Sequence, residues 1–191
     1  PEHKGWWNEP GTDTPDDPLE TPVRGLLRLK PCHVLDFLAH FVVFETKKGK
    51  TTKKVARYQQ FEAVNDLVDR VVGLVGKPVT AQDRTGLIWH TQGSGKSLTM
   101  IFAGYKLRRH PRLNNPTVLI VVDRRDLKTQ LSDDFEACDY PNVEKALGVE
   151  DLKRRLRGDW RGTLVTTLQS FQRMDRLPPR ERDNIVSLVD E

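Results

Sequence analysis

The run from residue 90 to residue 97, His-Thr-Gln-Gly-Ser-Gly-Lys-Ser, has the composition of a phosphate-binding loop. Glycines let the backbone approach a phosphate closely and adopt φ angles above zero, and the free N–H groups at the start of a helix attract anions. In such a loop Lys96 would reach the β and γ phosphates of a nucleotide, and Ser97 would ligate Mg²⁺. The run therefore predicts binding of ATP or GTP, and its contacts are expected from Thr91, Gln92, Gly93, Ser94, Gly95, Lys96 and Ser97.

One position departs from the usual loop pattern, because His90 stands where that pattern has a glycine. The shorter core, Gly93 to Ser97, is intact, and an apolar segment precedes it. We interpret His90 as a structural residue at the end of a strand, since nothing near it supplies a base or a nucleophile. The alternative is a glycine-rich turn that has no ligand.

An acidic pair, Asp190 and Glu191, follows the apolar run Ile185–Val189 at the end of the sequence. A nucleotide hydrolase needs one carboxylate to hold the Mg²⁺ shell and a second to polarise the attacking water. We therefore expect Asp190 to serve the metal and both residues, with Lys96, to be catalytic. The alternative is an acidic pair on a surface strand.

Apolar runs and helical patterns alternate around the loop, which is typical of a parallel sheet covered by helices on both faces. The expected strands are 86–89, 117–122, 163–167 and 184–189, and the expected helices are 96–109, 125–137 and 143–156. Before them, an amphipathic helix is expected over 56–74. The pattern predicts an α/β fold.

We expect three regions along the chain. Residues 1–32 are rich in proline and acidic residues and read as a linker or the tail of another domain, and 33–55 as a connector with a helix over 34–44 and a basic turn. Residues 56–191 would form one domain. The pairing of Pro15-Asp16 with Glu45-Thr46-Lys47 imitates a nuclease motif, but linker and helix-end positions argue against it.

Composition excludes several classes of protein. No apolar run approaches the length needed to cross a membrane, and the separated Cys32 and Cys138 favour reduced thiols over a disulfide or zinc framework. The net charge of +4 is compatible with a phosphate-rich partner. Basic clusters at 47–54, 108–109 and 153–155 are either a DNA track or solvated surface.

Five segments in order carry a family resemblance: 56–64, 86–100, 121–131, 166–171 and 189–191. They are similar to the adenine, phosphate-loop, DNA-facing and Asp-Glu motifs of the restriction (R) subunit of type I restriction-modification enzymes, a superfamily 2 helicase-like translocase. The stretch 89–100 is the most specific. The resemblance implies a RecA-like P-loop NTPase domain that uses ATP and Mg²⁺.

The resemblance also implies site residues. Gln60, a better candidate than Gln59, would read the adenine edge, and the DNA backbone would be held by Arg124, Arg125, Thr166 and Thr167. Each also has a plain structural interpretation: an exposed helix face for the glutamines, a helix-terminal charge for Arg125 and a strand filler for Thr167.

The implied enzyme is an ATP-dependent type I site-specific deoxyribonuclease, which translocates double-stranded DNA before cleavage together with modification (methyltransferase) and specificity subunits. We expect a cytoplasmic protein of a bacterium or archaeon. The sequence would be a fragment that stops within its acidic motif, without the upstream nuclease and the second motor domain. Another superfamily 2 helicase or remodeller, and a nucleotide-binding module without hydrolysis, are the alternatives.

Overall fold

A computed structural model describes residues 31–78, 80, 82–89, 93–174 and 184–190 of the chain. In chain order, its helices and strands are α2 (Pro31–His40), β1 (Val42–Lys47), β2 (Lys50–Val55), α3 (Tyr58–Leu74), α4 (Lys96–Arg109), η1 (Pro111–Leu113), β3 (Thr117–Val122), α5 (Arg125–Ala137), β4 (Val143–Lys145), α6 (Val149–Arg157), β5 (Thr163–Thr167), α7 (Leu168–Gln172) and β6 (Ile185–Val189). Each described helix is too short or too polar to span a bilayer.

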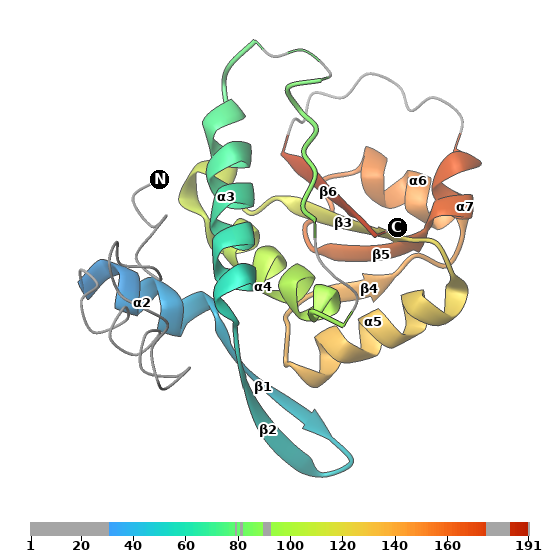
Figure 1. Ribbon diagram of the computed structural model, residues 1–191. Helices are drawn as coiled ribbons and strands as arrows, with labels where there is room; N and C mark the ends of the chain where they lie inside the picture. Colours follow the sequence, from blue (N-terminus) through green and yellow to red (C-terminus); the bar gives the residue numbers. More distant parts are fainter. Residues whose placement is uncertain (1–30, 79, 81, 90–92, 175–183, 191) are drawn as a thin grey trace.

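The central sheet has the strand order β4-β5-β3-β6, and all its pairs are parallel (Figure 1). The β-branched run of β3 is buried along its whole length, as a strand covered on both faces must be. The predicted α/β class is confirmed.

Alternate residues of β3 enter two separate cores, because successive side chains of a strand point to opposite faces. Val118, Ile120 and Val122 pack in a cluster that includes residues of α3, α4 and α5. Leu119 and Val121 pack with residues of α6 and β5. Helices therefore cover both faces of the sheet, as predicted.

Aromatic side chains join α2 to the same core. The ring of Phe41 lies 4.7 Å from that of Phe61 in α3 and 5.8 Å from that of Phe102 in α4. The Phe37 ring stacks on that of Phe41, with centroids 5.7 Å apart. The connector helix thus packs directly on the helix that follows the phosphate loop.

The predicted strand 86–89 is wrong. These residues form no strand, and Leu87 and Trp89 are 82% and 79% exposed. The segment is tethered through its neighbour: the Arg70 guanidinium of α3 donates to the carbonyl of Thr85 at 2.7 Å. A strand requires a paired neighbour, and no backbone ladder reaches 86–89 in the described part of the chain, which explains the difference.

The helix expected over 56–74 begins at Tyr58, and two other predicted helices differ by four residues or more at one end. The helix expected over 34–44 ends at His40, because the β-branched Val42 and Val43 pair with β2 across an antiparallel hairpin. The helix expected over 143–156 begins at Val149, since Val143–Lys145 pairs with β5 as the fourth strand of the sheet. The helices 96–109 and 125–137 and the strands 117–122 and 163–167 match their predicted bounds.

Cys138 is a buried free thiol, and burial raises its pKa. The side chain of Cys32 lies outside the described residues.

Candidate nucleotide-binding site

The phosphate loop leads directly into α4. Gly93 and Gly95 have φ angles of 78° and 87°, and Gly95 is the residue that caps the helix. Lys96 and Ser97 are its first two residues. This places the predicted phosphate and magnesium ligands at a helix N-terminus, where the N–H groups and the positive end of the helix dipole favour an anion. His90, Thr91 and Gln92 lie outside the described residues.

Position 95 favours glycine for two reasons. Its carbonyl accepts from the Thr99 backbone N–H at 3.0 Å and from the Gln60 side-chain amide at 3.1 Å. A Cβ at residue 95 would lie 2.8 Å from Gln60 Nε2. The positive φ would strain any other residue, and the added Cβ would displace the Gln60 amide.

Gln60 connects the start of α3 to the loop. Its Nε2 donates to the carbonyls of Ser94 at 3.4 Å and Gly95 at 3.1 Å, and its Oε1 accepts from the Arg57 N–H at 2.8 Å. The side chain is 2% exposed, whereas that of Gln59 is exposed. The adenine contact stays a prediction for Gln60, whose amide protons are engaged by the loop in this state.

The loop has the features that a polyphosphate ligand requires. The Oγ of Ser94 is buried without a hydrogen-bond partner among the described residues, and such a group calls for a ligand or water. A Cβ at Gly93 would have nothing within 4 Å, so space is open beside the loop. The described loop residues therefore fit a bound nucleotide.

The carboxyl ends of three strands meet at one edge of the sheet. Val121 is in register with Thr166 of β5 and with Val189 of β6, and the Asp190 N–H donates to the Val121 carbonyl at 2.9 Å. Asp190 therefore continues the ladder into the row that contains Thr167. In open parallel sheets ligands bind at this edge. Figure 1 shows α4 beginning on the same side of the domain. Glu191 lies outside the described residues.

The four predicted DNA ligands differ in exposure. Arg124 and Arg125 follow β3 and are exposed at the start of α5. Thr166 is 0% exposed within β5, and its hydroxyl is enclosed. Thr167 caps α7, because its Oγ1 accepts from the Ser170 N–H at 3.3 Å. The described arrangement offers the two arginines to a ligand and encloses the Thr166 hydroxyl.

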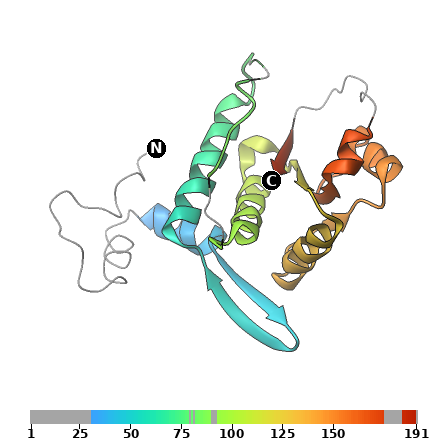
Figure 2. The same cartoon turned by 45° about the vertical axis from the view of Figure 1, so that its right-hand side comes forward.

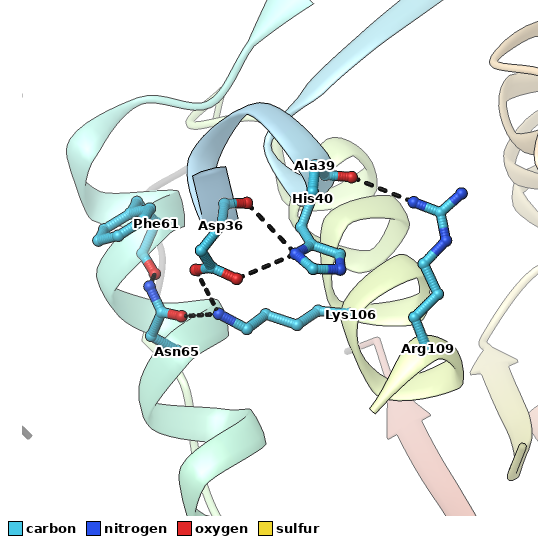
Figure 3. Close-up of polar contacts among 7 residues, drawn as sticks. All are labelled: Asp36, Ala39, His40, Phe61, Asn65, Lys106 and Arg109. Atoms are coloured by element: carbon cyan, nitrogen blue, oxygen red, sulfur yellow. Dashed lines mark hydrogen bonds and ion pairs between the residues drawn. The ribbon is translucent and has the colours of Figure 1, made fainter. Parts of the chain in front are cut away.

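The far end of α4 is held by a polar cluster that no sequence pattern predicts (Figure 3). Lys106 donates to Asp36 of α2 at 2.6 Å and to the Asn65 amide oxygen of α3, and His40 also bonds to the Asp36 carboxylate, at 2.9 Å. Arg109 donates to the Ala39 carbonyl at 3.1 Å. The cluster joins α2, α3 and α4, so the helix that presents Lys96 is fixed at both ends.

Opposing effects act on the charge of Asp36. Burial alone would raise its pKa, but hydrogen bonds from His40 and Lys106 outweigh burial and hold the pKa below its ordinary value. Asp36 is therefore ionised and paired at neutral pH. No motif announces this cluster, because its members are far apart in the sequence and meet only through packing.

Comparison with known proteins identifies the family to which this domain belongs. The profile of the SWI2/SNF2 ATPases matches residues 59–191, a range that begins at the start of α3 and includes the loop, the sheet and the acidic end. The chain belongs to the SWI2/SNF2 ATPase family. For this ATPase domain, the observed parallel sheet and the loop before α4 are the expected architecture.

Relatives of this SWI2/SNF2 ATPase are subunits of restriction enzymes, which confirms the resemblance seen in the sequence. The type I restriction enzyme HindI endonuclease subunit of Haemophilus influenzae is 38% identical over 185 residues, which cover 92% of this chain and 17% of the relative. The putative type I restriction enzyme MjaIXP endonuclease subunit of Methanocaldococcus jannaschii is 32% identical, and the match covers 91% of this chain and 16% of the relative. The type I restriction enzyme SsaAORF53P endonuclease subunit of Staphylococcus saprophyticus is 26% identical, and the match covers 85% of this chain and 17% of the relative. The chain thus spans less than a fifth of the curated relatives it matches.

Proposed function

We propose that this chain is the first motor domain of a type I restriction endonuclease subunit, where it binds ATP with Mg²⁺ and couples hydrolysis to translocation of double-stranded DNA. The observation that carries the proposal is the loop itself: Gly93 and Gly95 at positive φ lead into α4 within a SWI2/SNF2 ATPase domain. The 38% identity to a restriction subunit supports the choice of parent enzyme.

Each residue at the loop has a proposed role. Lys96 would bind the terminal phosphates, and Ser97 and Asp190 would hold Mg²⁺, which would supply positive charge to neutralise the negative charge that develops on the phosphates in the transition state. Glu191 orients the attacking water, and the open edge of the sheet beside Asp190 supports this placement. Thr91, Gln92, Gly93 and Ser94 complete the cradle. Gln60 holds the loop through the Gly95 carbonyl and contacts adenine when its amide is released.

DNA is proposed to run along the same edge of the sheet. Arg124 and Arg125 are exposed there, and guanidinium groups bind phosphates without reading bases, as a motor that moves along any sequence requires. Thr166 and Thr167 are both buried, at 0% and 4% exposed, so either would have to become accessible to add a hydroxyl contact.

The parent protein is proposed to cleave DNA after translocation, with modification and specificity subunits, in the cytoplasm of a bacterium or archaeon. Residues 1–32 would be the linker to an upstream nuclease, and residues 33–55 would connect that linker to the motor. Phe37 and Phe41 of this connector pack in the motor core. A second motor domain would follow residue 191. The endonuclease names of the relatives favour this parent over a remodeller of the same family.

Substitution of Lys96 tests the proposal. In the full-length subunit, Lys96→Ala should abolish DNA translocation, measured by displacement of a triplex-forming oligonucleotide, and leave the far-ultraviolet circular dichroism unchanged. Lys77→Ala, which removes an exposed lysine outside the loop, is the matched control and should translocate normally. Normal translocation by the Lys96 variant would refute the assigned role.

A further inference from the structure

The hairpin of β1 and β2 projects from the domain, and both views show its tip standing clear of the other elements (Figures 1 and 2). Its base is fixed: Val43 is buried, and the Ala56 N–H donates to the Phe41 carbonyl at 2.9 Å. Lys47 pairs with Asp134 of α5 at 2.6 Å. Phe44 and residues 46–53 are exposed, so their side chains are accessible to a partner.

A tight turn gives the tip a defined shape. Lys48 and Gly49 form the two-residue loop, with φ angles of 50° and 73°, as in the turns whose twist matches that of paired strands. The hydroxyls of Thr46 and Thr51 bond across the strands at 2.9 Å. The turn therefore fixes the backbone positions from which the side chains of the tip extend.

The hairpin carries an uncompensated positive charge. Residues 42–55 contain five lysines and one glutamate, a net charge of +4 that equals the formal net charge of the whole chain. Glu45 pairs with both Lys47 and Lys54. Lys48, Lys50 and Lys53 are exposed and form no ion pair with any described residue.

The charges also oppose one another. Lys47 stands directly across from Lys50 in the ladder, and like charges in opposite positions destabilise a hairpin. Glu45 and Asp134 offset the charge of Lys47, whereas Lys50 forms no ion pair with a described residue. A two-stranded hairpin is of marginal stability alone. A polyanion bound to the tip would relieve this repulsion, whereas an apolar partner would have to desolvate unpaired ammonium groups.

One face of the hairpin combines the groups that suit a nucleic-acid backbone. Phe44, 56% exposed, lies opposite Lys53, and Thr46 lies opposite Thr51. Ammonium and hydroxyl groups bind phosphates, and an exposed ring contacts sugars or bases. The set carries no paired amides or guanidinium forks in position to read a base sequence.

We propose that this hairpin is a separate DNA contact, in which Lys48, Lys50 and Lys53 bind the phosphate backbone of duplex DNA without reading its sequence. The inference rests on the proposed function in so far as the polyanion is DNA. It adds a site to the two arginines at the start of α5 and gives the motor a second hold on its track.

Helix α5 joins the hairpin to the two arginines. Lys47 contacts Asp134, nine residues along α5 from Arg125, and the helical rise of 1.5 Å per residue separates these positions by about 14 Å. That is the span of about four phosphates of one strand. Of the three carboxylates on this path, Asp133 and Asp134 pair with Lys145 and Lys47, and Asp126 forms no ion pair with a described residue.

The test is the salt dependence of DNA binding by the full-length subunit without nucleotide. The variant K48Q/K50Q/K53Q and the wild type are titrated with a fluorescent duplex at several salt concentrations. Each lost phosphate contact reduces the slope of log K against log salt by about 0.9. We expect the slope to fall by about 2 to 3 and the affinity at 0.1 M salt to fall on the order of tenfold or more.

A matched control removes the same charge elsewhere. Lys77, Arg112 and Arg157 are exposed outside the hairpin, and K77Q/R112Q/R157Q should keep nearly the wild-type slope. The proposal is overturned if the salt slope of the hairpin variant equals that of the wild type, or if the control variant loses as much slope as the hairpin variant. It is also overturned if the hairpin variant no longer binds a protein subunit while its salt slope for DNA is unchanged. Because the titration contains no nucleotide, it tests the DNA contact of the hairpin separately from the proposed role of Lys96 in ATP binding.

Discussion

The Gln60 side chain and the Gly95 backbone fit against each other: Nε2 of Gln60 donates to the Gly95 carbonyl at 3.1 Å, and a Cβ on residue 95 would lie 2.8 Å from the same nitrogen. The contact joins residues 35 positions apart. It places the start of α3 and the phosphate loop under one constraint, so the position of the loop depends on a buried amide outside the loop.

Removal of that amide should loosen the loop. Gln60→Ala deletes the donor to Gly95 and the acceptor for Arg57 N–H, which costs about 1 to 2 kcal/mol of stability, and we expect the dissociation constant for ATP to rise on the order of tenfold. A fluorescent ATP analogue and thermal unfolding measure the two effects. Gln59→Ala, on the exposed side, should change neither. Equal ATP affinity in the Gln60 variant and the wild type would show that the amide does not position the loop.

Gly95 and Gly76 separate two causes of strain. Both have positive φ, but a Cβ at Gly76 has open space, whereas a Cβ at Gly95 meets Gln60. Gly76→Ala should cost about 1 kcal/mol through its backbone alone, and Gly95→Ala should cost more and lose ATP binding. Chemical denaturation of the full-length subunit compares the two. Equal losses of stability would mean that Gln60 yields to the added methyl group.

Gly104 provides a test of packing, because the observed contact and the usual helix preference for alanine predict opposite signs for the change in stability. Alanine in place of a glycine within a helix usually stabilises by up to about 1 kcal/mol. Here the added Cβ would lie 2.7 Å from Tyr140 Oη, so Gly104→Ala should destabilise by about 1 to 3 kcal/mol. Tyr140→Phe removes that oxygen, and the double variant should recover part of the loss. A stabilising Gly104→Ala would contradict this packing.

The cluster around Lys106 should make stability depend on pH. Asp36 has a lowered pKa in the folded chain, so its contribution is present above the unfolded value of about 4 and is lost as the pH falls through the folded value. Asp36→Asn should destabilise at pH 7 by about 1 to 3 kcal/mol and flatten the decline of stability between pH 5 and about pH 3. Unfolding by urea at several pH values measures both effects. The control Glu136→Gln removes an exposed carboxylate and should keep the wild-type decline; an unflattened decline in the Asp36 variant would contradict the assignment.

The sequence predicted the central elements well because their signals are local. A β-branched run such as 117–122 and the helix 96–109, which follows the glycine loop and precedes Pro111, carry their own boundaries. The loop residues and the acidic end were predicted from residue types alone, and the family match spans both regions.

The elements that the sequence did not predict depend on partners distant in the chain. Val42 and Val43 become a strand because Lys54 and Val55 return to pair with them, and Val143–Lys145 becomes a strand because β5 lies beside it. Residues 86–89, although apolar, have no such neighbour in the described chain. The polar cluster of Lys106 was missed for the same reason, since three helices must pack before it exists.

The central claim is that ATP hydrolysis at the loop serves movement on DNA. The most direct measurement is single-turnover ATP hydrolysis by the full-length subunit, with its partner subunits, in the presence and absence of duplex DNA. We expect hydrolysis that DNA stimulates and that Lys96→Ala abolishes. A rate of zero under both conditions, or a rate that Lys96→Ala leaves unchanged, would contradict it.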